Sequence, residues 1–176
     1  MSTYQESGLI ITLPDGEHFR FQDCQAYKQL SGVNLKEMDF GWWQTDTNTL
    51  WLIELKEYAH LTYEEQLPDY LLDNLVNKAT DSLLMLAAMW AKTNQGLKLA
   101  ECLPPVIHQF SGRLKLFFIL KIDKIAFKSQ IGVLKDELKN RLRGRIAFFD
   151  VRHVTLVDHL TAIKCGLPLV INETSI

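Results

Sequence analysis

The sequence predicts an α/β fold in which a mixed β-sheet is covered by helices. From residue 33 onward, apolar segments of strand length alternate with segments whose apolar residues recur at helical spacing. No internal repeat or low-complexity linker interrupts this alternation. The 176 residues, of which 47% are hydrophobic and 23% charged, have the composition of a globular protein and are expected to form one domain over 1–176.

The N-terminal segment predicts a β-hairpin followed by a short helix. Residues 8–13 and 17–21 are short apolar strands on either side of a Pro-Asp-Gly turn, in which Pro presets φ and Gly accepts a positive φ. Asp23 is expected to cap a helix that runs to about Leu30. Gly32 is expected to end that helix in the left-handed conformation.

The following patterns continue the alternation of strands and helices. Residues 38–58 read as two apolar strands around a polar turn. A long helix is expected after Asp69, because apolar residues recur at helical spacing as far as Trp90, and its second half is apolar all round and should be buried. Three later elements are a core strand over 114–122, a helix over about 127–143 and a strand over 145–150.

The three cysteines and the apolar runs bear on the cellular compartment. Cys24, Cys102 and Cys165 are far apart and show no zinc-ligand spacing, so they are expected to be reduced thiols. The longest apolar run, residues 83–91, is far shorter than the roughly 20 residues that a bilayer requires, and the first residues lack the pattern of a signal peptide. A cytoplasmic protein without a membrane partner is therefore expected.

The second strand of the 38–58 segment is apolar enough to be buried, yet it carries charged residues near its end. Glu54 and Lys56 share one face, because residues two apart in a strand point the same way. If Asp46 and Thr47 are the centre of a two-residue turn, Asp39 lies directly opposite Glu54, with Cβ atoms about 4.5–5.5 Å apart. Two carboxylates at that distance need a cation between them. That cation is either a metal ion or a lysine in a structural triad, unless this end of the hairpin simply reaches solvent.

The Asp in Met-Asp-Phe (38–40) and the Glu-x-Lys that follows four apolar residues (50–53) resemble the core of the PD-(D/E)XK (restriction-endonuclease-like) nuclease superfamily. The resemblance covers roughly residues 36–95 and the strand after them. It implies a restriction-endonuclease-like α/β fold, to which the N-terminal β-hairpin would be an addition. It also implies that a helix and then a strand follow Glu-x-Lys.

The same resemblance implies a catalytic site and a metal. Asp39, Glu54 and Lys56 would be catalytic, and Asp39, Glu54 and the backbone carbonyl of Leu55 would bind Mg²⁺ or Mn²⁺. Carboxylate oxygens are the ligands that Mg²⁺ prefers, and a bound Mg²⁺ polarises a phosphodiester and acidifies water. Met38 stands where the motif has Pro, and the segment around Gln25 lacks the acidic residue that some members carry.

The function implied is a metal-dependent nuclease that hydrolyses phosphodiester bonds, with DNA as the expected substrate. The alternative is a catalytically inactive binding or assembly protein of the same fold, with a structural Asp/Glu/Lys triad. The histidines and serines show no spacing typical of a metal site or a catalytic triad, and no phosphate-binding glycine loop occurs. The sequence leaves open DNA against RNA, endonuclease against exonuclease, and whether the chain forms a homodimer.

Contacts with nucleic acid are expected from basic and aromatic residues. The net charge is −2, but residues 113–145 hold a strong excess of Lys and Arg. The residues singled out are Lys78, Arg141, Arg143 and Arg145. Each also has an explanation that involves no ligand. Lys78 could lie on a solvated helix face, and the arginines could lie near a helix C-terminus, where the helix dipole stabilises positive charge. Either Trp42 or Trp43, but not both, could stack on a base.

Overall fold

The computed structural model describes residues 1–32, 34–57, 70–122 and 130–171. In this part of the chain, the larger of two sheets has five strands in the order β3-β4-β5-β6-β7. These are β3 (His18–Phe19), β4 (Phe40–Gln44), β5 (Thr49–Glu57), β6 (Arg113–Lys121) and β7 (His153–Asp158). The pairs β3–β4 and β4–β5 are antiparallel, whereas β5–β6 and β6–β7 are parallel, so the predicted mixed sheet is confirmed.

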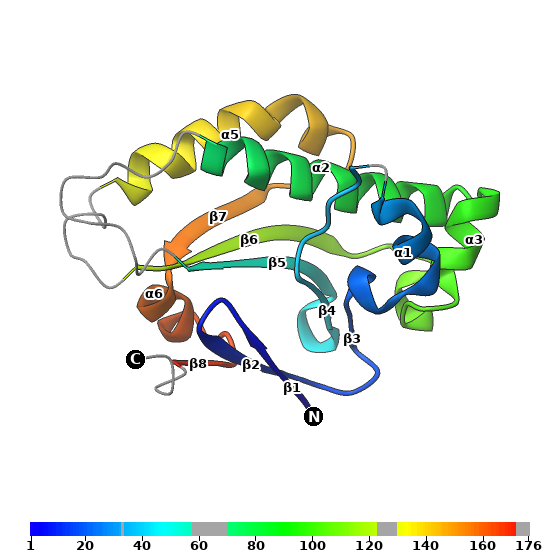
Figure 1. Ribbon diagram of the computed structural model, residues 1–176, viewed down its shortest axis with the longest axis horizontal. Helices are drawn as coiled ribbons and strands as arrows, with labels where there is room; N and C mark the ends of the chain where they lie inside the picture. The colour runs from blue at the N-terminus through cyan, green and yellow to red at the C-terminus, as the bar shows by residue number, and fades with distance from the viewer. Residues whose placement is uncertain (33, 58–69, 123–129, 172–176) are drawn as a thin grey trace.

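Helices lie between the parallel strands in the chain, as parallel pairing requires. The helices α2 (Tyr70–Trp90) and α3 (Asn94–Ala100) come between β5 and β6, and α5 (Ile131–Ala147) comes between β6 and β7. Figure 1 shows α2 and α5 side by side on one face of the large sheet, with α1 (Gln25–Ser31) near α3. A helix and then a strand therefore follow Glu-x-Lys, as expected. Asp69, the expected start of the long helix, lies outside the described residues.

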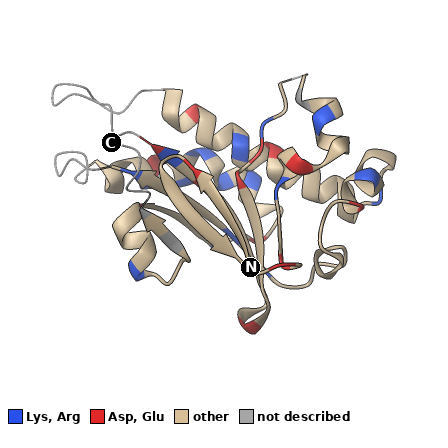
Figure 2. Ribbon diagram, turned by 60° about the horizontal axis from the view of Figure 1, so that its bottom comes forward, with Lys and Arg blue, Asp and Glu red and all other residues tan. Residues whose placement is uncertain are grey.

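A small sheet covers the opposite face of the large sheet. It consists of β1 (Ser2–Glu6), β2 (Leu9–Leu13) and β8 (Leu169–Ile171), and α6 (His159–Lys164) lies beside it (Figure 1). Figure 2, in which this side comes forward, shows few charged positions on these strands, because Glu6 is the only charged residue in their sequences. The molecule is thus layered as helices, large sheet and small sheet.

Two apolar clusters separate these layers. Leu50 and Leu52 of β5 belong to the cluster between the large sheet and the helices, whereas Ile53 and Leu55 belong to the cluster between the two sheets. β5 is therefore buried on both faces, as its nearly continuous apolar sequence indicates. Glu54 lies on the same face as Leu50 and Leu52, under the helices.

The predicted N-terminal hairpin pairs different strands from those expected. Residues 8–13 do form a strand, β2, but β2 pairs with β1 through a turn at Ser7 and Gly8, and with β8. Pro-Asp-Gly does turn the chain, with Gly16 at φ 75, but β3 after it pairs with β4 of the large sheet. The turn signal is local, whereas the choice of pairing partner depends on which apolar face each strand buries. The polar sequence of β1 gave no sign of a strand.

Three local predictions are wrong. The residue that precedes α1 as its cap is Cys24 rather than Asp23, and Gly32 has a right-handed φ of −67. The segment 145–150 is not a strand, because α5 continues through its arginines to Ala147 and the next strand, β7, begins only at His153. Lys and Arg are good helix formers, so the basic segment prolongs the helix.

The second half of α2 is only partly buried, since the Leu84 side chain is 58% exposed. No helix in the described ranges is both long and apolar enough to cross a lipid bilayer.

The cysteines also depart from expectation. Cys24 and Cys102 form a disulfide with a Cα–Cα distance of 5.5 Å, while Cys165 is free and exposed. The bond joins the start of α1 to the loop after α3, two segments separated by 78 residues in the chain. Spacing along the sequence could not show that the fold brings these two segments together. Because disulfides are typical of oxidising compartments, the cytoplasmic location stays a prediction.

Candidate active site

The β4–β5 hairpin places Asp39 opposite Glu54. Phe40 pairs with Ile53 and Gln44 with Thr49, and the next pair outward is Asp39 with Glu54. The predicted register is therefore confirmed. The turn differs, because residues 45–47 form a 3₁₀ turn and Asn48 closes it at φ 50. This four-residue loop holds the same register as the expected two-residue turn.

Asp39 is held against β5, and the chain that leads to it is fastened to α2. Its Oδ2 accepts a 2.7 Å hydrogen bond from the Leu55 backbone N–H, which fixes the carboxylate against β5. The chain leading to it is fastened to α2, since Met38 N–H donates to Ser82 Oγ at 2.9 Å and Lys36 N–H donates to Asp81 Oδ2 at 2.9 Å. Asp81 therefore supports this segment rather than facing the two carboxylates.

Glu54 is fully buried and lies between two ammonium groups. The Lys78 Nζ is 2.7 Å from Oε1 and 2.9 Å from Oε2 of Glu54, and the Lys56 Nζ is 3.2 Å from Oε1. Burial, and after it the negative charge of Asp39, raise the pKa of Glu54 to about 7 although both lysines oppose the change. Glu54 Oε1 has close charged neighbours but accepts no hydrogen bond of good geometry within the described ranges.

Lys78 is the cation that lies between the two carboxylates. It reaches down from α2, and its Nζ also donates to Asp39 Oδ1 at 3.2 Å. Burial opposes its charge, but the carboxylates of Glu54 and Asp39 outweigh burial and raise the pKa of Lys78 above its usual value. Lys78 was singled out as a contact to nucleic acid, from a helix position that could face the metal site or a phosphate. The structure instead makes it the central member of a cluster with Asp39, Glu54 and Lys56, which we call the charged cluster.

The sequence contained a signal for this placement. Positions 71, 75, 82, 85 and 89 of α2 are all buried and follow the alternating three- and four-residue spacing of one helix face. Lys78 occupies the place between 75 and 82 in this series. A lysine on a buried helix face needs a buried partner, and the unpaired acids of the hairpin are such partners.

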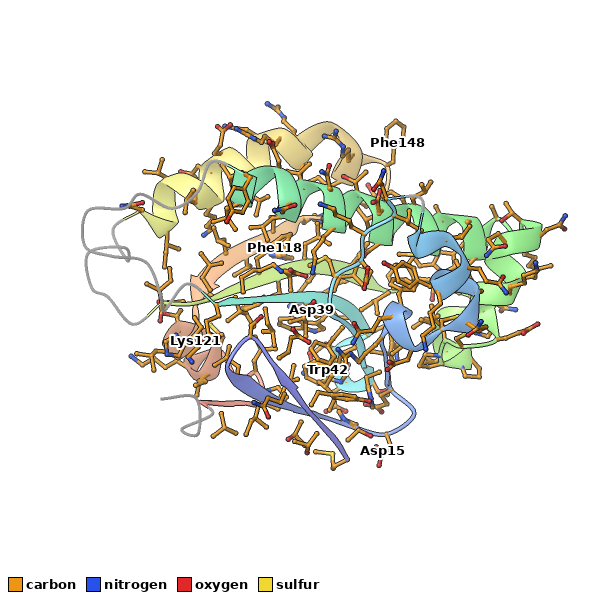
Figure 3. All side chains as sticks on the ribbon, in the orientation of Figure 1. Asp15, Asp39, Trp42, Phe118, Lys121 and Phe148 are labelled. Atoms are coloured by element: carbon orange, nitrogen blue, oxygen red, sulfur yellow. A yellow bond between two sulfur atoms is a disulfide. The ribbon has the colours of Figure 1, made fainter. Side chains whose placement is uncertain are left out.

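The exposure of the four side chains shows where the charged cluster meets solvent. Lys56 is 31% exposed, Lys78 18%, Asp39 13% and Glu54 0%. Figure 3 shows Asp39 near the middle of the molecule, below α2. A ligand would therefore meet Lys56 first and then Lys78 and Asp39, with Glu54 behind them.

The tip of the β1–β2 hairpin touches the end of β5 beside the charged cluster. Ser7 Oγ donates to the Leu55 carbonyl at 3.0 Å, so the expected metal-binding carbonyl already accepts a hydrogen bond. Glu6 lies close enough that, after burial, the charge of Asp39 is the next cause that raises the pKa of Glu6. Arg20 offsets this charge, with its Nη2 3.3 Å from Glu6 Oε2. Sequence reasoning missed Glu6, because it lies far away in the chain in a polar segment.

The arginines predicted to bind nucleic acid lie on α5 and are partly engaged. Arg141 is 2.6 Å from Asp73 of α2 and 2.8 Å from Glu137. Arg145 donates to the Arg141 carbonyl at 2.8 Å. Arg143 is exposed and makes no contact that involves charge or hydrogen bonding within the described ranges. Of the predicted nucleic-acid contacts, only Lys78 joins the charged cluster.

The tryptophans beside the cluster are occupied by packing. Trp42 faces the small sheet and stacks with Trp51 at a centroid distance of 6.0 Å, on the face opposite Glu54. Trp43 is 6% exposed and packs edge-on against Phe110. Neither ring is open to a base at the charged cluster.

The donor set at the charged cluster suits a hard divalent ion. Asp39 and Glu54 are carboxylates, which Mg²⁺ and Mn²⁺ favour, and Mg²⁺ is usually bound through one or two carboxylates with several waters retained. Glu54 Oε1 is a buried acceptor that lies near two ammonium groups but accepts no hydrogen bond of good geometry within the described ranges, so it could also serve as a metal ligand. Among the described residues, however, no group of three or more His, Cys, Asp or Glu side chains forms a ready metal site. Comparison of the chain with protein-family models, curated proteins and solved structures gives no match.

Proposed function

We propose that this protein is a metal-dependent nuclease of the restriction-endonuclease-like fold. Its substrate is nucleic acid, with DNA proposed ahead of RNA. The observation that carries the proposal is that Asp39, Glu54 and Lys56 meet on one face of the β4–β5 hairpin, with a cation between the carboxylates. The antiparallel hairpin, the helix and the parallel strand that follow also accord with the resemblance to PD-(D/E)XK nucleases.

Asp39 and Glu54 would hold the metal. When bound there, Mg²⁺ would polarise the phosphodiester and lower the pKa of a water molecule. Lys56 is the most exposed member of the charged cluster and would orient water and offset phosphate charge. Lys78 keeps the carboxylates together in the metal-free protein, because two unscreened carboxylates would repel each other.

The raised pKa of Glu54 has a consequence for metal binding. With a pKa of about 7, Glu54 is partly protonated in the metal-free protein at neutral pH. A metal binds the deprotonated carboxylate, so binding would release a proton. Metal affinity should therefore rise as the pH increases from about 6 to 8.

A second candidate is the inactive binding or assembly protein. The observation that favours it is the complete burial of Glu54 beneath Lys78, whose ammonium contacts both carboxylates. The charged cluster is then complete without metal, and its value is structural. Removing one partner of a buried ion pair typically costs about 3–5 kcal/mol, so each substitution would act on stability rather than on turnover.

The experiment that separates the two candidates measures cleavage and metal binding together. The full chain is incubated with Mg²⁺ or Mn²⁺ and with single- and double-stranded DNA and RNA, and Mn²⁺ binding is followed by its effect on thermal unfolding. We expect cleavage by the parent protein. Lys56→Met should abolish cleavage and retain the Mn²⁺-dependent stabilisation, whereas Asp39→Asn should lose both.

Asp46→Asn is the matched control, because Asp46 lies exposed in the turn of the same hairpin. It should behave like the parent in both assays. A parent protein that shows neither cleavage nor stabilisation by Mn²⁺ would support the inactive alternative. Cleavage that persists in both Lys56→Met and Asp39→Asn would exclude the charged cluster as the catalytic site.

A further inference from the structure

A cavity of about 480 Å³ opens where β6 and β7 begin, at the opposite end of the parallel strands from the charged cluster. Arg113, the first residue of β6, pairs with Thr49 at the start of β5, five residues before Glu54. At about 3.3 Å per residue, the cavity is roughly 17 Å from the charged cluster along the strands. It is therefore a separate feature of the molecule.

Three basic side chains line this cavity. They are Arg113 at the start of β6, Arg152 just before β7, and His153, the first residue of β7. All three are exposed, and their side chains form no hydrogen bond or ion pair within the ranges that the structure describes. This sets the two arginines apart from Arg141, which contacts two carboxylates. Asp150 is the acidic residue on the wall, so basic groups prevail.

A second cavity of about 480 Å³ continues from the first and is lined by aromatic rings. The two share Gly112, Leu114, Phe149 and Asp150, and the second adds Trp90, Phe110 and Phe148. Phe148 is 89% exposed and projects from the end of α5 in Figure 3. Trp90 and Phe110, which also line this cavity, stack at a centroid distance of 5.0 Å.

The backbone at the junction of the two cavities is tightly packed. A Cβ at Gly112 would lie 2.5 Å from the Asn48 carbonyl oxygen and 2.9 Å from the Trp43 ring. Any other residue at this position would have to displace the backbone at Asn48, so the close packing here requires glycine. The combined site thus has a basic compartment and an aromatic compartment, joined at Phe149 and Gly112.

We propose that this combined site binds a nucleoside phosphate, either as a free nucleotide or as the end of a nucleic-acid strand. The forked guanidinium groups of Arg113 and Arg152 are suited to bidentate contacts with phosphate oxygens. The base stacks on the exposed ring of Phe148, an interaction that any nucleobase can make. Asp150 accepts a hydrogen bond from a sugar hydroxyl or a base amino group. This site stands apart from the proposed nuclease function and survives if that function fails.

The test measures binding of AMP, adenosine and inorganic phosphate to the full chain by calorimetry, without divalent metal. We expect AMP to bind more tightly than either adenosine or phosphate, because only AMP fills both compartments. Arg113→Gln combined with Arg152→Gln should weaken AMP about tenfold or more. Arg143→Gln is the matched control, as an exposed arginine on α5 outside the cavity, and should bind AMP like the parent.

Phe148→Ala keeps the proposal testable if the double variant does not fold, because so exposed a side chain adds little to the core. It should weaken AMP and leave phosphate binding unchanged. Asp39→Asn should bind AMP like the parent. A 5′-phosphorylated oligodeoxynucleotide that binds much more tightly than AMP identifies a strand end as the ligand, and equal affinity identifies a free nucleotide. The proposal is overturned if the protein binds neither AMP nor the oligodeoxynucleotide. It is also overturned if the arginine and Phe148 substitutions leave the affinity for AMP unchanged.

Discussion

Glu54 is a carboxylate with no exposure to solvent, held at the centre of a cluster of two acids and two lysines. Its pKa is raised from 4.5 to about 7 by burial and by Asp39. The folded protein therefore binds a proton at Glu54 more tightly than the unfolded chain does. The contribution of this proton to stability is fully present below about pH 4.5 and is lost as the pH rises through about 7.

We predict that Glu54→Gln removes a pH-dependent component of stability. In the parent protein this component should lower the free energy of unfolding, on the order of 3 kcal/mol, as the pH rises from about 4.5 to about 7. Glutamine has no proton to lose, so the variant should lack the component. Urea denaturation at a series of pH values measures both proteins. Equal pH profiles would show that Glu54 ionises normally in the folded state.

The β1–β2 hairpin is the element that joins the small sheet to the charged cluster. Its turn has Ser7 at φ 50 and Gly8 at φ 67, and Ser7 binds the Leu55 carbonyl. Gly8 lies against the ion pair between Lys121 and Glu57, whose Nζ–Oε1 distance is 2.8 Å. A Cβ at Gly8 would lie 2.4 Å from the Lys121 Nζ and 2.7 Å from Glu57 Oε1. The turn therefore depends on glycine for its positive φ, and any larger residue would also have to shift the ends of the Lys121 and Glu57 side chains.

We predict that Gly8→Ala destabilises the protein more than Gly16→Ala does. Gly16 has a similar φ of 75, but its Cβ would meet nothing within 4 Å. Both variants carry the strain of a left-handed residue, about 1–2 kcal/mol, and only Gly8→Ala also has to shift a partly buried ion pair. Chemical denaturation of the two variants measures the difference. If they lose equal stability, the turn is not packed against Glu57 and Lys121.

At the scale of the whole molecule, the disulfide between Cys24 and Cys102 ties the α1 segment to the loop after α3. Such a link stabilises the folded protein mainly because it restricts the unfolded chain, and the effect grows with the length of the closed loop. The two cysteines are 78 residues apart in the sequence. The loop that the disulfide closes contains the β4–β5 hairpin and all of α2. The candidate site is thus inside the segment that the disulfide closes.

We predict that reduction lowers the free energy of unfolding by about 2–4 kcal/mol. Titration with a thiol reagent should find one reactive thiol, Cys165, before reduction and more after it. Cys165→Ser is the control and should leave stability unchanged, because its side chain is free and exposed. Three reactive thiols in the untreated protein would instead support the reduced state that the cysteine spacing suggested.

The sequence alone determined the features that depend on local periodicity. The alternation of apolar segments specified the mixed sheet and the course of α2, and the period of two along β5 placed Glu54 and Lys56 on one face. The hairpin register was predicted from a two-residue turn at Asp46 and Thr47. The turn is instead a four-residue loop, but the register is the same, and a slip of one residue would turn the buried apolar faces of both strands outward. Asp39 opposite Glu54 was therefore predictable.

Only the tertiary structure decided which distant segments meet. Lys78 joins the two carboxylates because α2 crosses above β5, and Glu6 approaches because the N-terminal hairpin pairs with β8 rather than with β3. The same holds for Cys24 with Cys102, and for Arg113 with Arg152. Each of these contacts joins residues far apart in the chain, whose proximity depends on how the layers pack. Propensity and spacing describe the chain only over a few residues. They can mark Lys78 as a lysine on a buried helix face that needs a partner, but they do not say which distant residues it meets.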